Sequence, residues 1–177
     1  RSPQMKTAKV NSILHNPKQQ WKQIVASNHR GLRLAYRKLE VDWVTYNINV
    51  LKEHNLYATG TTGRLISNIV TGIKTPEVDG KFAIFYEEIK PLKDKVTCLL
   101  SGPLGGDSQI GAMIAEGKID VLIFFCDNLI TQGHQQDVGA LSRLASLYNI
   151  AFATNRTTAD MILTSSLFDN HDYERSS

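Results

Sequence analysis

Cysteine is scarce in this chain, which has only Cys98 and Cys126 among its 177 residues. The two form no CxxC pair, which excludes a disulfide scaffold and a cysteine zinc cluster and favours a reducing compartment, so we expect a cytoplasmic protein. Long apolar runs are also lacking, and none approaches the roughly 18 residues that a membrane-spanning helix needs. Residues 1–20 contain no apolar stretch of the kind found in secretory signals, so we expect no such signal.

Acidic residues are missing from the first part of the sequence. Residues 1–39 contain nine Lys/Arg and no Asp or Glu, whereas residues 40–177 contain 11 Lys/Arg and 17 Asp/Glu, a formal charge of −6. A basic segment of this kind suits nucleic acid, an anionic membrane or a phosphorylated ligand, or it is a solvated arm with no specific partner. Nucleic acid is disfavoured, because only Trp21 and Tyr36 are available there for base stacking.

The remaining pattern is that of one folded domain, since 42% of the residues are hydrophobic and the length fits a single core. Apolar segments typical of strands alternate with helical stripes. Strands are expected at 22–26, 56–58, 96–100, 119–125 and 150–153, and helices at about 32–53, 65–70, 110–114, 138–147 and 157–164. This alternation predicts a single doubly wound, Rossmann-like α/β domain with a mostly parallel sheet of about five strands flanked by helices.

Two glycine-rich loops follow predicted strands, at Thr59-Gly60-Thr61-Thr62-Gly63 and at Ser101-Gly102-Pro103-Leu104-Gly105-Gly106-Asp107. Ligands bind at the carboxyl ends of strands in such folds. Glycine lets backbone N–H groups approach an anion closely, and the following helix adds partial positive charge. Two converging loops predict a phosphate site, although neither is a Walker loop or a GxGxxG fingerprint. Each loop alone is explained structurally if the threonines cap a helix and the glycines form turns.

Ionisable residues follow the same strands. Asp107 ends the second loop, and Asp127, His134 and Asp137 follow the apolar run 119–125. Neighbouring acids and a histidine suit proton transfer, because their surroundings can separate their pKa values. Each also has a structural explanation: Asp107 and Asp137 as first-turn acids, Asp127 in a turn, and His134 on a surface loop. The spacing matches no standard ligand motif, so we expect no metal and no other cofactor.

Several of these segments together resemble the methylglyoxal synthase family. The resemblance lies in LYATGTTGRLI (56–66), SGPLGGDSQIGAMIAEGKIDVLIFF (101–125), ALSRLASLYNIAFATNRTTAD (140–160) and the spacing Asp127…His134…Asp137, and it covers about 56–70 and 96–168. It implies a lyase that converts dihydroxyacetone phosphate into methylglyoxal and inorganic phosphate, a product that can also inhibit. It further implies a homohexamer.

The resemblance also implies roles for individual residues. Asp107 would be the general base, His134 would polarise the carbonyl group and move protons between the enediol oxygens, and Asp127 and Asp137 would orient and tune that pair. The phosphate would be held by Thr59, Thr61, Thr62, Ser101 and Gly102. The alternative is a catalytically weak domain of the same family that binds a phosphorylated metabolite as a regulatory sensor.

The chain departs from the family pattern in three places. Ser27-Asn28 replaces a His-Asp pair at the end of the first strand, and Arg30, Arg33 or Arg37 is left to supply the cation of a missing lysine. Residues 72–95 are an insertion between the two loops. Arg175 is the candidate for a C-terminal arginine that reaches a neighbouring subunit's site. We therefore divide the chain into a basic extension (1–18), the family domain (19–168) and a tail (169–177).

Overall fold

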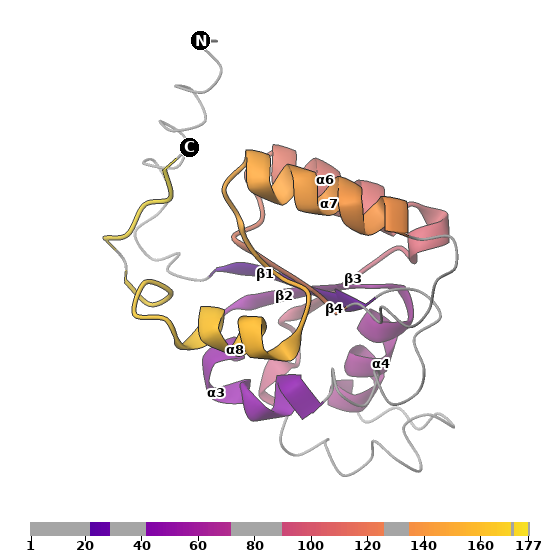
Figure 1. The fold of residues 1–177 in the computed structure, drawn as a ribbon. Helices are drawn as coiled ribbons and strands as arrows, with labels where there is room; N and C mark the ends of the chain where they lie inside the picture. Colours follow the sequence, from indigo (N-terminus) through magenta and orange to yellow (C-terminus); the bar gives the residue numbers. More distant parts are fainter. Residues whose placement is uncertain (1–21, 29–41, 72–89, 126–134, 171, 177) are drawn as a thin grey trace.

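The computed structural model describes residues 22–28, 42–71, 90–125, 135–170 and 172–176. Its strands are β1 (Gln23–Asn28), β2 (Asn55–Thr59), β3 (Val96–Leu99), β4 (Val121–Phe125) and β5 (Ala151–Ala153). They form one sheet in the order β3-β2-β1-β4-β5, and every neighbouring pair is parallel (Figure 1). The predicted α/β class, with five parallel strands flanked by helices, is confirmed.

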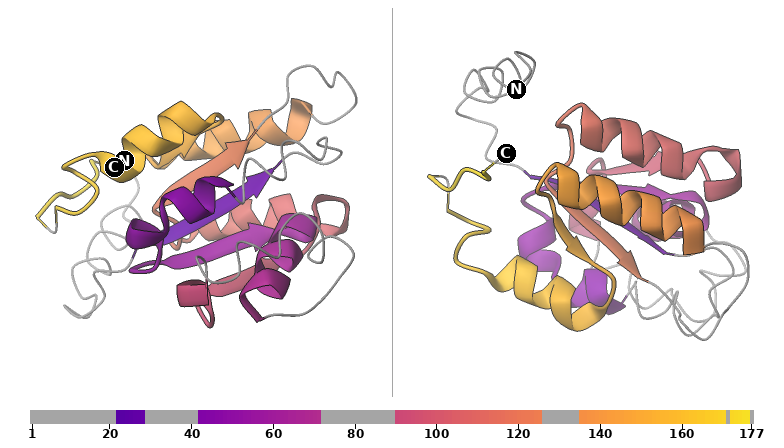
Figure 2. Two further views of the ribbon diagram at one scale, coloured as in Figure 1. Left: turned by 90° about the horizontal axis from the view of Figure 1, so that it is seen from below. Right: turned by 45° about the horizontal axis from the view of Figure 1, so that its top comes forward.

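Helices cover both faces of this sheet. The α-helices are α3 (Ile48–Leu51), α4 (Gly60–Thr71), α6 (Gly106–Ala115), α7 (Gln135–Leu147) and α8 (Arg156–Thr164), and two 3₁₀ turns are η3 (Lys90–Leu92) and η4 (Gly102–Leu104). Figures 1 and 2 show α6 and α7 on one face and α3, α4 and α8 on the other. Within the described ranges, none of these helices is long and apolar enough to cross a membrane.

The apolar spacing of each helix explains which side faces the sheet. Ile110 and Ile114 of α6 are fully buried four residues apart, which places both on one helix face. They join Leu141 and Ala145 of α7 in one hydrophobic cluster with the side chains of β4 that point to that face. The opposite face carries a second cluster, in which the buried Trp43 ring meets Phe125 edge-on with the centroids 5.8 Å apart.

The strand positions explain two contrasting burial patterns. β4 lies between β1 and β5, and all five of its residues are buried, as a near-continuous apolar run predicts. β3 lies at the edge of the sheet with β2 as its neighbour, and Thr97 and Cys98 are exposed. An apolar stretch such as VTCLL therefore identifies a strand but not its place in the sheet.

The region before β3 is described only in part. The helix expected over about 32–53 is present at 42–46 and in α3, with a turn at Asn47, whose amide donates to the Trp43 carbonyl oxygen at 3.0 Å. Residues 32–41 lie outside the described ranges. Of the 72–95 segment the structure describes residues 90–95, where Leu92 of η3 is fully buried against the core.

Candidate functional site

The predicted loops leave the sheet at the carboxyl ends of its strands. We call this side the carboxyl edge and the side with the amino ends of the strands the amino edge; neither is the edge formed by an outer strand such as β3. Thr59 at the end of β2 is paired with Leu99 of β3, and Asn28 at the end of β1 is paired with Phe125 of β4. The carboxyl ends of these four strands lie at the right of Figure 1, where α4 and α6 begin. In a doubly wound sheet this edge is where ligands bind.

The loop after β2 touches the loop after β3. Gly60 begins α4 with φ +50°, a conformation that L side chains rarely adopt, and a Cβ added there would lie 3.0 Å from Ser101 Cα. Gly63, one turn further, approaches β2 so closely that an added Cβ would lie 2.6 Å from the Ala58 carbonyl oxygen. The start of α4 is therefore pressed against the strand ends, and the two predicted phosphate loops lie side by side.

The second loop is a tight turn held by its own backbone. The Ser101 carbonyl oxygen accepts hydrogen bonds from the N–H groups of Leu104 at 2.9 Å and Gly106 at 3.0 Å. Gly105 has φ +102°, and a Cβ added to Gly106 would lie 2.1 Å from the Leu100 carbonyl oxygen. Close packing therefore requires glycine at position 106, whereas at position 105 the positive φ of the turn favours it.

Asp107 lies in the first turn of α6, directly after this loop, and is half-buried. A Cβ added to Gly102 would lie 3.4 Å from Asp107 Oδ2, so the carboxylate is turned back over the loop. Gln109 fixes the backbone of the residue before the loop, because its Oε1 accepts the Leu100 N–H at 2.7 Å. A carboxylate is thus fixed beside two helix amino ends, whose partial positive charge favours an anion.

The remaining predicted residues are placed less fully. The backbones of Thr61 and Thr62 lie in the first turn of α4, and that of Asp137 lies in the first turn of α7, at the same edge. Asp127 and His134 lie outside the described residues, as do the basic residues from Arg30 to Lys38. Among the residues that the structure does describe, no group of three or more His, Cys, Asp or Glu could hold a metal ion.

Arg175 lies at the opposite edge of the sheet. Its guanidinium donates to the carbonyl oxygens of Asp120 at 3.2 Å and Ile119 at 3.4 Å, and lies 3.7 Å from Asp120 Oδ1. These residues directly precede β4, so Arg175 ties the end of the chain to the amino edge of its own subunit.

Sequence reasoning also missed His54, a buried histidine at the amino edge. His54 Nδ1 accepts the Lys22 N–H at 2.9 Å, and its ring meets Phe168 edge-on at 5.0 Å between centroids. Burial lowers the pKa of His54, and the nearby Lys22 charge lowers it further. A neutral imidazole is therefore part of the packing between β1 and the segment after α8. Only long-range contacts bring these three residues together, and no local pattern signals them.

Comparisons with known proteins all point to one family. A sequence model of the MGS-like domain matches residues 41–154. The methylglyoxal synthase of Maridesulfovibrio salexigens is 48% identical over 133 residues, which cover 75% of this chain and 79% of that protein. The methylglyoxal synthase of Yersinia enterocolitica is 46% identical over 132 residues, covering 75% and 72%. The crystal structure of methylglyoxal synthase from Elizabethkingia anophelis superposes with a TM-score of 0.64 at 35% identity, covering 85% of this chain and 82% of that one.

Proposed function

Because the chain belongs to the MGS-like domain family and has the function of a methylglyoxal synthase, a lyase acting on a phosphorylated substrate, we propose that its active site is the carboxyl edge and that Asp107 is the general base. The observation that carries this assignment is the Asp107 carboxylate, turned over Gly102 in a loop that touches the start of α4. This position supports the assignment, because proton removal next to a phosphate group requires a proton acceptor beside the groups that bind the phosphate.

The first chemical step is proton transfer to Asp107. Dihydroxyacetone phosphate binds with its hydroxymethyl carbon facing the carboxylate, which takes a proton from that carbon. The C–H electron pair forms the enediolate, whose negative charge develops on the former carbonyl oxygen. Hydrogen bonds aimed at that oxygen stabilise the charge in a site shielded from water. We propose His134 as the group that polarises this oxygen and moves protons between the enediol oxygens.

The second step expels phosphate. A proton moves from the terminal hydroxyl to the negatively charged oxygen, so that the terminal carbon becomes an aldehyde and the C=C electrons form a new double bond to the carbon that carries the phosphate. The C–O bond to the phosphate breaks, and its electron pair leaves with the phosphate group. The remaining enol gives up its hydroxyl proton and takes up a proton on its CH₂ carbon, which becomes the methyl group of methylglyoxal. This outcome is favoured when the C–O bond stands perpendicular to the enediolate plane. We propose that Thr59, Thr61, Thr62, Ser101 and Gly102 fix the phosphate in that position. Inorganic phosphate, the product, binds the same groups and inhibits.

Two acids complete the proposed site. Asp137 lies in the first turn of α7 at the same edge, and Asp127 follows β4 by two residues in the sequence. We propose that both orient and tune the pair of Asp107 and His134, with no metal and no other cofactor taking part. Asn28, at the end of β1 beside Phe125, stands where the family pattern has an acid. The base itself is present, so we expect this replacement to alter the rate more than the reaction.

The organisation of the chain is a further proposal. We propose a basic extension at 1–18, the family domain at 19–168 with its insertion at 72–95, and a tail at 169–177. We also propose a cytoplasmic homo-oligomer, a hexamer by resemblance. Exposed apolar side chains support self-association, because Leu104 is 71% exposed on the loop before α6 and Leu147 is 65% exposed at the end of α7. Light scattering of the purified protein tests the assembly.

The function is tested by incubating the protein with dihydroxyacetone phosphate and quantifying methylglyoxal and inorganic phosphate. We expect the two products in equal amounts, and a turnover about 10²–10⁴-fold lower in Asp107→Asn. Asp94→Asn is the matched control, because Asp94 is exposed and its φ of 68° suits asparagine. Thermal stabilisation by phosphate without any turnover would instead support the regulatory sensor and contradict the proposed reaction.

A further inference from the structure

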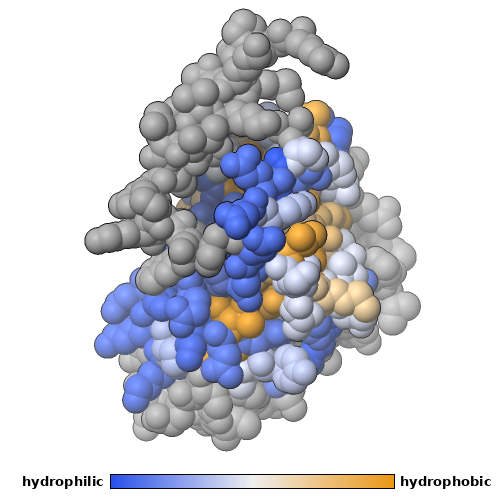
Figure 3. All heavy atoms as spheres, turned by 90° about the vertical axis from the view of Figure 1, so that its left-hand side faces the viewer, coloured by the Kyte–Doolittle hydropathy of each residue, from blue (hydrophilic) through white to orange (hydrophobic). Residues whose placement is uncertain are grey.

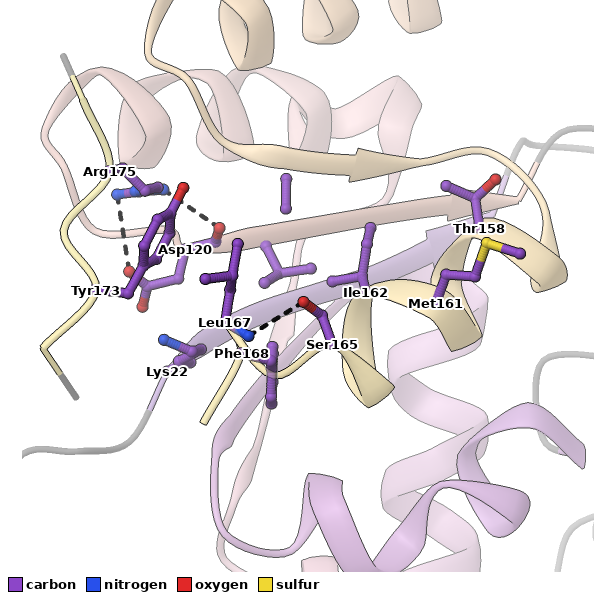
Figure 4. A pocket seen from close by; sticks show the side chains of 12 residues that line it. Lys22, Asp120, Thr158, Met161, Ile162, Ser165, Leu167, Phe168, Tyr173 and Arg175 are labelled. Atoms are coloured by element: carbon purple, nitrogen blue, oxygen red, sulfur yellow. Dashed lines mark hydrogen bonds and ion pairs between the residues drawn. The ribbon is translucent and has the colours of Figure 1, made fainter. Parts of the chain in front are cut away.

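A cavity lies at the amino edge of the sheet, at the opposite ends of β1, β4 and β5 from the proposed active site. It has a volume of about 350 Å³, within the range of pockets that hold small organic ligands. Figure 3 shows the face of the molecule toward which this edge is turned, with hydrophobic side chains exposed between hydrophilic ones. Figure 4 shows the cavity itself, between α8 and the last residues of the chain.

One half of the cavity is apolar. Val121 and Ala151 contribute from the first residues of β4 and β5, and Met161 and Ile162 contribute from α8. After α8 the chain turns at Ser165, whose Oγ accepts the Leu167 N–H at 3.2 Å, and brings Phe168 against His54. Met161 is 67% exposed. A ligand that covered this side chain would remove apolar surface from water, which is favourable.

The other half carries the charged groups of the cavity, Lys22, Asp120 and Arg175, together with Tyr173. Asp120 is already engaged, since its Oδ2 accepts the Gln23 N–H at 2.7 Å and its Oδ1 faces Arg175. Lys22 Nζ lies 5.4 Å from the centre of the Phe168 ring. No carboxylate within the described part of the chain forms an ion pair with it. This half therefore carries one positive charge in excess.

We propose that this cavity binds a small organic anion with an apolar body, such as a medium-chain or aromatic monocarboxylate. The anionic group lies between Lys22 and Arg175, and the apolar body lies along Val121, Ile162 and Met161. A cationic ligand would meet Lys22, and Asp120, the one acid among the residues that line the cavity, is already engaged by Arg175 and the Gln23 N–H. Because these residues are not those of the lyase site, binding here stands independently of the proposed function.

The experiment compares three ligands of equal chain length: octanoate, 1-octanol and octylammonium. Their binding to the full-length protein is measured by isothermal titration calorimetry. We expect octanoate to bind about fivefold or more tightly than 1-octanol, and octylammonium to bind most weakly, as one partly exposed charge contact implies. Lys22→Met keeps the apolar stem and should weaken octanoate about fivefold without changing 1-octanol. Lys93→Met, an exposed lysine outside the cavity, is the control.

A second variant tests the apolar half. Met161→Gln changes an exposed side chain, so folding is preserved, and it should weaken octanoate and 1-octanol equally. The proposal is overturned if octanoate does not bind, if it binds no better than 1-octanol, or if Lys93→Met weakens it as much as Lys22→Met does. If Met161→Gln instead lowers the molar mass in light scattering and leaves octanoate affinity unchanged, the groove is covered by a second copy of the chain and the proposal is wrong.

Discussion

At the carboxyl ends of β2 and β3 the chain uses glycines and short polar side chains, whereas at the amino ends of β1 and β4 it uses long side chains. At the carboxyl edge, backbone packs directly against backbone: a Cβ added to Gly60 would lie 3.0 Å from Ser101 Cα. At the amino edge, the side chains of Arg175 and Lys22 line a cavity of about 350 Å³. A phosphate site needs backbone N–H groups at close range, and an amphipathic ligand needs space and one spare charge.

The largest effect on stability is expected from adding a methyl group at the carboxyl edge. Gly106→Ala places a Cβ 2.1 Å from the Leu100 carbonyl oxygen, so backbone must move, and we expect a loss of about 1–3 kcal/mol in unfolding free energy together with lost turnover. Urea denaturation measures the first quantity. Gly139→Ala in α7 is the matched control, since its Cβ meets nothing within 4 Å and should stabilise the helix by about 0.5–1 kcal/mol. Equal effects of the two variants would contradict the close packing of the loop.

A smaller effect is expected from removing one phosphate ligand. Ser101→Ala deletes a hydroxyl beside Gly60 and should raise KM for dihydroxyacetone phosphate, and the inhibition constant for phosphate, by about three- to tenfold through one lost hydrogen bond. Because the contact is to the phosphate in both ground and transition states, kcat should change less. Steady-state kinetics with phosphate as inhibitor provide the measurement. A drop in kcat with KM unchanged would place Ser101 with the reacting atoms instead.

At the amino edge, Arg175→Met releases the tail from Asp120 and the Ile119 carbonyl oxygen. The guanidinium is partly exposed, so we expect a loss of only about 1 kcal/mol, read from the urea midpoint. Lys118→Met is the comparison, because its ion pair with Glu116 lies on the exposed surface and should contribute less to stability than the contacts of Arg175. If Arg175→Met lost turnover, the amino edge would influence the active site, and the contacts of Arg175 do not explain such an influence.

The smallest effect is expected from pH. The pKa of His54 is lower in the folded chain than in the unfolded one, so the unfolded chain binds more protons as the pH falls. The stability contributed by neutral His54 is therefore fully present above the ordinary histidine pKa and is lost as the pH falls through the folded value. His54→Gln keeps an acceptor for the Lys22 N–H and should flatten the decline in melting temperature on acidification. If the melting temperature of His54→Gln fell with pH as steeply as that of the wild type, other groups would be responsible for the decline.

The hydrophobic periodicity of the sequence was enough to predict the strands and helices, and to predict that the two glycine-rich loops meet at the carboxyl edge. The run VLIFF is buried throughout because it is a central strand, and the loops at Gly60 and Ser101 meet because the strands before them are parallel neighbours. The exposure of Cys98 depends on which strand lies at the edge, and local sequence does not encode that order. The amino edge was unpredictable for the same reason: Arg175 and Asp120 are 55 residues apart in sequence and meet only through the folded sheet.

The central claim is that proton removal belongs to the carboxyl edge alone, and Asp107→Asn tests it most directly. Turnover of dihydroxyacetone phosphate at saturation is measured for this variant beside Asp94→Asn, and octanoate affinity is measured on the same preparations. We predict that Asp107→Asn lowers turnover by about 10²–10⁴-fold, as loss of a general base does, while octanoate affinity stays at the wild-type value. Wild-type turnover in Asp107→Asn, or a parallel loss of octanoate affinity, would contradict the account.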